Sequence, residues 1–203
     1  MDTYVIRSST LAALKSVLAG FHGACLDLGC GIMPYRKLIL SPPSRVIKYV
    51  GIDSVAVSEK TSIDLSWDGV SIPLEDCAVD CALAINFLQC SLDPPNVLRE
   101  LVRVLKPEGS LFITVPYVVL SSARSSDFYR YASHFLVEEL KASGFNEISV
   151  YPMGSWNFSL AHMIGLWVKN ALLDPEAQSE SAQNLFPFFE ALSESEDVGP
   201  ADL

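Results

Sequence analysis

Residues 26–31 have the sequence LDLGCG, and this stretch decides the fold that we expect for the chain. The short apolar run from Ala24 to Leu28 is typical of a buried strand, and it stops at two glycines one residue apart, Gly29 and Gly31. Glycines allow the backbone to approach a ligand at a distance that side chains would block. In open α/β sheets, ligands bind beyond the carboxyl ends of the strands. The stretch therefore predicts a ligand site at the end of the first strand.

Strand and helix patterns alternate along the rest of the chain, which indicates βαβ units, a parallel sheet and right-handed crossovers. Helices are predicted at 8–19, from Pro34, from Pro95 and at 133–143, where Gly144 ends the last of them. Two more are expected at 155–173 and 182–193, before a frayed tail. Further strands are predicted at 46–52, 61–66, 79–85, 110–115 and 148–151.

Three classes of ligand compete for the glycine loop. A nucleoside triphosphate would require a Lys followed by Ser or Thr after the glycines, and this pair is missing. A dinucleotide would require a small residue where Pro34 stands, and its pyrophosphate would meet Asp27 unfavourably. An adenosyl amino acid carries no phosphate, and Asp27 would help to hold its ammonium group. The residues favour this third ligand.

A carboxylate also ends the second predicted strand, in the run YVGID at 49–53. Asp53 lies 22 positions after Gly31, where a carboxylate can accept hydrogen bonds from both hydroxyls of a ribose. The alternative is an ordinary surface Asp in a turn.

Several further motifs accompany the glycine loop. With DLGCGIMPY at 27–35 and YVGID at 49–53, the runs WDG at 67–69 and LRELVRVLKPEG at 98–109 resemble the class I S-adenosylmethionine-dependent methyltransferases, and more narrowly the type 11 methyltransferase domain. Residues 127–131, DFYRY, are similar to a subgroup often associated with polysaccharide and secondary-metabolite gene clusters. The resemblance covers about residues 20–153.

This resemblance implies a Rossmann-like, three-layer α/β/α sandwich with a mostly parallel sheet. We find no stretch that predicts the last, antiparallel strand usual in this class, and extra C-terminal helices are expected instead. Residues 1–153 would form the methyltransferase domain, and residues 154–203 a helical extension with an acidic tail belonging to the same domain.

The resemblance also implies S-adenosyl-L-methionine as the cofactor. For Asp68, expected to bind the adenine amino group, the alternatives are a turn-forming Asp-Gly pair or Asp64 in its place. For Asn86, expected at the methionine end, the alternative is a hydrogen bond at a strand end. The cofactor-binding residues that we expect are Asp27, Gly29, Cys30, Gly31, Asp53, Ser54, Asp68, Gly69 and Asn86.

The loop from Pro116 to Ala132 is expected to border the methyl acceptor. Candidate acceptor-binding residues are Tyr117, Asp127, Tyr129 and Arg130, and candidate catalytic residues are Tyr117, Arg130 and His134, with no catalytic base identified. Arg130 would bind a carboxylate or phosphate of the acceptor, or would simply pair with Asp127 one helical turn away. Relatives often have Glu-His where this chain has Gln89-Cys90.

Charge and composition exclude several classes of function. The net charge is −10, and no Lys or Arg follows Lys169, so neither nucleic acid nor an anionic membrane is an expected partner. The five cysteines lack a zinc-site spacing, so we expect no metal; read as reduced thiols, they indicate a cytoplasmic protein. A length of 203 residues fits one domain, and no signal peptide is visible at the N-terminus.

The sequence thus predicts a methyltransferase that acts on a hydroxyl or amine of a small-molecule or sugar acceptor. An alternative is a catalytically inactive cofactor-binding scaffold or partner subunit, suggested by Gln89-Cys90 and by the missing last strand. A nicotinamide oxidoreductase is disfavoured by Asp27 and Pro34.

Overall fold

A parallel sheet in the order β3-β2-β1-β4-β5 forms the centre of the part of the chain that the computed structural model describes, which is residues 2–54, 62–117, 127–154, 159–160 and 163–164. All four neighbouring pairs of strands are parallel. This arrangement, with helices on both faces, confirms the predicted fold class. The strands are β1 (His22–Leu28), β2 (Arg45–Ser54), β3 (Leu65–Trp67), β4 (Val79–Ile85) and β5 (Leu105–Thr114).

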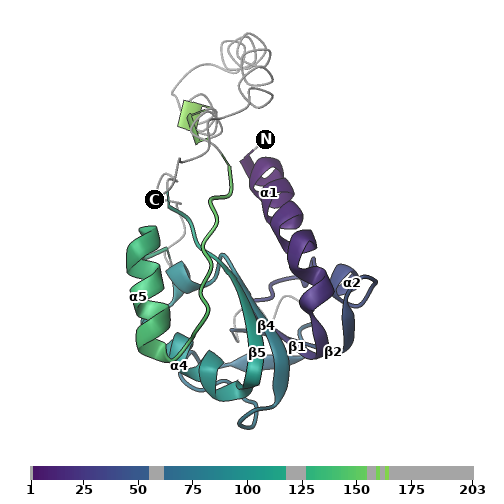
Figure 1. Cartoon of the computed structure of the whole chain (residues 1–203). Coiled ribbons are helices and arrows are strands. Elements are labelled where there is room, and N and C mark those ends of the chain that lie inside the picture. The colour runs from purple at the N-terminus through teal and green to yellow at the C-terminus, as the bar shows by residue number, and fades with distance from the viewer. Residues whose placement is uncertain (1, 55–61, 118–126, 155–158, 161–162, 165–203) are drawn as a thin grey trace. The chain divides into compact units, whose positions relative to one another are not determined.

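Side-chain alternation along β1 separates the two layers of helices. Leu26 and Leu28 point into one buried cluster, which also contains residues of α4 (Pro94–Val104) and α5 (Ser133–Ser143). Cys25 points into the other, with Leu14 of α1 (Asp2–Val17) and Ile39 of α2 (Arg36–Ile39). Figure 1 shows α4 and α5 on one side of the sheet and α2 on the other. Two 3₁₀ turns, η1 (Leu18–Gly20) and η2 (Leu88–Cys90), precede β1 and α4.

Helices α4 and α5 have clear local causes. The Asp93 carboxylate caps α4 by accepting a hydrogen bond from the Asn96 amide at 3.0 Å, and Pro94 occupies the first helical position, one residue before the predicted start. Helix α5 covers the predicted 133–143 and ends at Gly144, whose φ of 107° is the left-handed conformation expected of a C-terminal glycine.

Three strands differ from the sequence prediction. Strand β3 begins at Leu65 and is shorter than the predicted 61–66, and part of that range lies outside the described residues. Strand β5 begins at Leu105, five residues before the predicted 110–115, because residues 107–109 form an irregularity within the strand, where the register jumps between Val79 and Cys81 of β4. The strand predicted at 148–151 is wrong: these residues pair with no strand of the described sheet, although Ile148 packs against its core.

By their internal contacts the residues form two units. One contains Leu14–Tyr117 and Ala123–Val150, and the other contains Met1–Ala13, Val118–Ser122 and Tyr151–Leu203. Of the predicted helix 155–173, the structure describes only residues 159–160 and 163–164, which are helical; the predicted helix 182–193 and the tail lie outside the described residues. No helix in the described part of the chain is long and apolar enough to cross a membrane.

The cap of α4 gives a direct test of this fold. We expect Asp93→Ala to lower the free energy of unfolding by about 1 kcal/mol, because the Asn96 amide loses its acceptor. Asp93→Ser should retain most of the stability, since a serine hydroxyl also caps helices. Urea unfolding of the three proteins measures this, and equal stability of the Ala and Ser variants would contradict the assigned cap.

Candidate cofactor site

The glycine loop crosses the carboxyl ends of β1 and β2. The backbone amides of Gly29 and Cys30 both donate hydrogen bonds to the carbonyl oxygen of Ile52, at 2.8 and 3.2 Å. The loop is therefore attached to the carboxyl end of β2, which agrees with the parallel pairing of Leu28 with Ile52.

Asp53 is fixed at the same place. Its Oδ2 accepts a hydrogen bond from the Gly31 amide at 2.8 Å, and its Oδ1 accepts one from the Ser54 amide at 2.7 Å. The side chain is largely buried, with 9% of the residue exposed. The structure thus brings together three residues predicted from motifs 22 positions apart, and it holds the Asp53 carboxylate beside the loop.

The two glycines are required for different reasons. Both have a positive φ, 75° at Gly29 and 54° at Gly31. A Cβ added to Gly29 would lie 2.2 Å from the Phe87 ring, so this glycine makes room for a neighbouring side chain. A Cβ added to Gly31 would meet nothing within 4 Å. The space in front of Gly31 is open, as a close approach by a ligand demands.

Asp27 is buried near the carboxyl end of β1, with 2% of the residue exposed. Its Oδ2 accepts a short hydrogen bond from the Tyr49 hydroxyl. Burial raises the pKa of Asp27 to about 6; the Tyr49 hydrogen bond acts against this rise, and the nearby Asp53 carboxylate adds to it. Asp27 is therefore a carboxyl group that titrates much closer to neutral pH than an exposed Asp does.

Tyr49 is a site residue to which the sequence analysis assigned no role. The guanidinium of Arg36 lies over its ring at 5.3 Å from the centroid, and Arg36 also pairs with Asp64 at 3.2 Å. Asp64 in turn accepts a hydrogen bond from the Gly51 amide at 2.8 Å. Asp64 thus joins β2 to α2.

Asp68 and Gly69 follow β3 directly, at the same edge of the sheet as Asp53. Asp68 Oδ1 accepts hydrogen bonds from the amides of Val70 and Ser71 at 2.8 and 3.2 Å, and these bonds lower the pKa of the exposed carboxyl. Asp68 Oδ1 thus has the role expected of a turn-forming Asp-Gly pair. Gly69 has a φ of 88°, and a Cβ there would meet nothing within 4 Å.

Asn86 ends β4 in a left-handed conformation with a φ of 49°. Its amide donates to both the carbonyl and the hydroxyl oxygen of Thr114, at 3.0 Å each, and its carbonyl accepts from Gln89 Nε2 at 2.9 Å. The Gln89 carbonyl oxygen accepts from the amides of Phe128 and Tyr129 at 2.9 and 3.3 Å. The Gln89 position thus attaches the predicted acceptor segment to the end of β4.

Within the acceptor segment, Asp127 and Arg130 form the ion pair that we gave as the alternative to anion binding. Two hydrogen bonds join the guanidinium to the carboxylate, at 2.6 and 2.8 Å. Tyr117 is 67% exposed, Tyr129 is 39% exposed, and His134 is exposed in the first turn of α5. No group of three or more His, Cys, Asp or Glu among the described residues is arranged to hold a metal ion.

Substituting the two glycines should separate their roles. We expect Gly31→Ala to lower the free energy of unfolding by about 1–2 kcal/mol, the cost of a left-handed conformation for alanine. Gly29→Ala should cost more, about 3 kcal/mol or above, because the Phe87 Cβ itself would lie 2.9 Å from the new methyl group and rotation of the ring cannot relieve that contact. Urea unfolding measures both, and equal losses would contradict the assignment.

The buried Asp27 should make stability depend on pH. The pKa of Asp27 is raised from 3.8 to about 6 in the folded protein, so the folded state binds more protons between these values and loses stability as pH rises through them. Asp27→Asn removes the charge and keeps an oxygen for Tyr49. We expect this variant to be more stable than the wild type by about 1–3 kcal/mol at pH 7.5, and to gain much less at pH 4.5. A difference that does not change with pH would refute the ionisation of a buried Asp27.

Comparisons with known proteins agree with this geometry. Residues 26–113, which run from β1 to the end of β5, match the methyltransferase domain family known as type 11. An uncharacterised 37.1 kDa protein in transposon TN4556 of Streptomyces fradiae is 37% identical over 129 residues. The match covers 56% of this chain and 36% of that protein, so the chain spans little more than a third of its relative's length.

Solved structures share the fold at low sequence identity. A SAM-dependent methyltransferase from Thermotoga maritima superposes with a TM-score of 0.56 at 20% identity, covering 71% of this chain and 74% of the other. The [4+2]-cyclase SpnF superposes with a TM-score of 0.58 at 21% identity, covering 91% and 77%. The parallel sheet, the glycine loop and the family match lead to one conclusion: the chain carries a type 11 methyltransferase domain at residues 26–113, with the fold of the class I S-adenosylmethionine-dependent methyltransferases.

Proposed function

We propose that this chain binds S-adenosyl-L-methionine and transfers its methyl group to a hydroxyl or amine of a small-molecule or sugar acceptor. The observation that carries the proposal is the open space in front of Gly31 beside the fixed carboxylate of Asp53, at the carboxyl ends of adjacent parallel strands. A ribose that enters this space would meet a carboxylate with a remaining acceptor capacity at each oxygen.

The charges of the site fit a cationic ligand. Asp27 and Asp53 are the last residues but one of β1 and β2, and Asp68 follows β3, so each contributes a carboxyl group to the same edge of the sheet. The phosphates of a dinucleotide would be repelled there, whereas the ammonium and sulfonium groups of S-adenosylmethionine would be attracted. We assign Asp53 to the ribose, Asp68 and Gly69 to the adenine, and Asp27 to the ammonium group.

When bound, S-adenosylmethionine supplies a methyl group on a sulfonium, which is already a strong electrophile. The protein therefore contributes mainly by orienting the acceptor, and a base is needed only for a neutral hydroxyl. The Gly29 and Gly31 backbone would fix the cofactor's position, and the Gln89 carbonyl would hold the Phe128–Tyr129 segment at the open side of the site.

Exposed aromatic rings support an acceptor that is not highly charged. Tyr117, Phe128 and Tyr129 are between 39% and 67% exposed, and Tyr129 lies 6.0 Å from the buried ring of Tyr131. Because the Arg130 guanidinium is paired with Asp127, we favour stacking of a sugar or ring-containing acceptor on these aromatic faces over binding of an anion. Excess negative charge disfavours nucleic acid as the acceptor, and the cysteine thiols favour the cytoplasm as its location.

Calorimetry on the purified chain tests the cofactor. We expect S-adenosylmethionine and S-adenosylhomocysteine to bind and NADH not to bind. Asp53→Ala should weaken binding of both ligands by about 1–3 kcal/mol, because hydrogen bonds to the ribose are lost. Glu138→Ala, which removes an exposed carboxylate of α5, serves as the charge-matched control. Unchanged affinity of Asp53→Ala would move the ribose site elsewhere.

The inactive scaffold remains the second candidate, because Gln89 and Cys90 replace the Glu-His of many relatives. Cofactor binding without turnover of any acceptor in a panel of sugars, phenols and amines would favour it. Consumption of S-adenosylmethionine with any of them would establish the enzyme.

A further inference from the structure

Three polar side chains of α4 hold the loop that carries Asp68 and Gly69. Asn96, Glu100 and Arg103 are spaced i, i+4 and i+7, so they lie along one face of the helix. The apolar residues Val97 and Leu101 are fully buried in the core. The polar stripe of α4 therefore has a role separate from that of its core-facing side.

The contacts of this stripe run along consecutive residues of the loop. Asn96 Nδ2 donates a hydrogen bond to the Val70 carbonyl at 2.7 Å. Glu100 Oε2 accepts hydrogen bonds from the Ile72 amide at 2.7 Å and from the Ser71 hydroxyl at 3.2 Å. The backbone immediately after Gly69 is thus bound to α4 on both its donor and its acceptor side.

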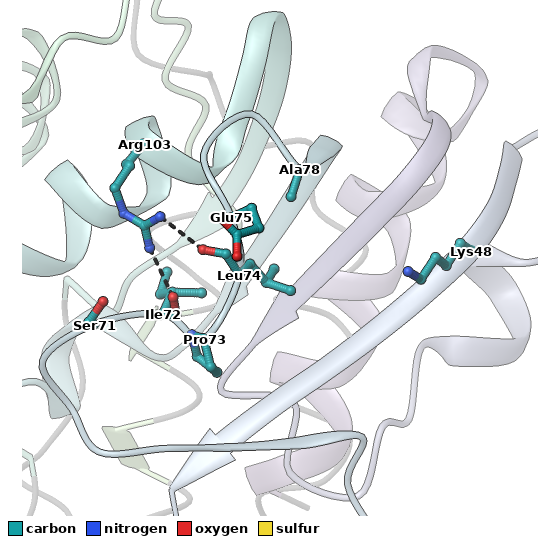
Figure 2. A pocket seen from close by; sticks show the side chains of 8 residues that line it. All are labelled: Lys48, Ser71, Ile72, Pro73, Leu74, Glu75, Ala78 and Arg103. Carbon is teal, nitrogen blue, oxygen red and sulfur yellow. Dashed lines mark hydrogen bonds between the residues drawn. The ribbon is translucent and has the colours of Figure 1, made fainter.

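Arg103 completes the set from the other end of the loop. Its guanidinium donates to the carbonyls of Ile72 and Leu74 at 2.9 and 2.8 Å, as Figure 2 shows, and it also pairs with Glu100 and Asp76 at 2.8 Å each. The guanidinium forms part of the wall of a shallow pocket that Pro73 and Glu75 also line. Both carbonyl partners of the guanidinium belong to the loop, so Arg103 is placed to hold the loop's backbone.

The loop depends on these contacts for its shape. Between Asp68 and Leu74 its backbone forms a single hydrogen bond to itself among the described residues, from the Leu74 amide to the Ile72 carbonyl at 2.7 Å. The remaining bonds come from the Asp68 carboxylate and from α4. Ile72 inserts its side chain into the core with 1% exposed, which fixes the loop's depth but not the direction of the turn before it.

We propose that Asn96, Glu100 and Arg103 are positioning residues that set the adenine edge of the cofactor site by fixing the loop after Gly69. This inference rests on the proposed function. It states that recognition of the adenine amino group by Asp68 depends on side chains of α4 that do not touch the cofactor.

A comparison of two ligands tests it: S-adenosylhomocysteine, and S-inosylhomocysteine, which has an oxygen in place of the adenine amino group. The wild type should prefer the first by about tenfold, the value of one hydrogen bond to a charged acceptor. In Asn96→Ala and Arg103→Ala we expect this preference to fall to threefold or less, with a much smaller change in the affinity for S-inosylhomocysteine. Arg99→Ala, an exposed cation on the same helix, is the matched control and should keep the preference.

The preference ratio separates positioning from general destabilisation, which would weaken both ligands equally. Circular dichroism and thermal unfolding show which variants fold, and Asn96→Ala, which loses a single hydrogen bond, provides the test if Arg103→Ala does not fold. Tenfold preference in folded variants would overturn the inference. A wild type that binds both ligands equally would overturn it together with the role of Asp68, while leaving the cofactor assignment intact. A wild type that binds neither would overturn the proposed function itself, and the inference with it.

Discussion

The hydrogen bond from the Gly31 amide to the Asp53 carboxylate, at 2.8 Å, is the contact on which the geometry of the site depends. It joins the loop after β1 to the end of β2, and the donation by Gly29 and Cys30 to the Ile52 carbonyl repeats this connection through the backbone. Both links require the register in which Leu28 is paired with Ile52. A one-residue slip would reverse the faces of the strand and separate the carboxylate from the loop, so sheet register and ligand site are specified together.

Asp27 shows that the site is not built for stability alone. A carboxyl group with 2% of its residue exposed costs free energy when it ionises, and the Tyr49 hydroxyl offsets only part of this cost, since burial still dominates its pKa. The Arg36 guanidinium lies over the Tyr49 ring and is itself paired with Asp64. A bound ammonium group would supply the opposite charge that Asp27 lacks, and this is a physical reason for a buried acid at that position.

The sequence was informative where one short segment contains the whole cause. The loop at 26–31, the Asp53 that ends β2, and the helix 133–143 with Gly144 after it could be predicted because glycine conformation and strand ends are local properties. The Tyr49–Asp27 hydrogen bond could not, because it depends on the register between β1 and β2. The strand predicted at 148–151 failed for a similar reason: its alternation fits a strand, but pairing requires a partner that the pattern does not contain. The polar spacing of Asn96, Glu100 and Arg103 was visible, yet nothing in the sequence indicated which loop they meet.

Helix α4 connects the hydrophobic core with the loop that carries Asp68. Its apolar residues pack on the same buried cluster as Leu26 and Leu28, the residues that lead into the glycine loop, while its polar stripe binds the loop after β3. The same helix therefore packs on the strand that leads into the glycine loop and binds the loop after β3. Because the apolar face and the polar stripe belong to one helix, α4 adds to the support of the Asp68 turn that β3 provides through its pairing with β2 over only three residues. A short edge strand is thereby sufficient to carry the turn that we propose for adenine recognition, since α4 supports that turn from outside the strand.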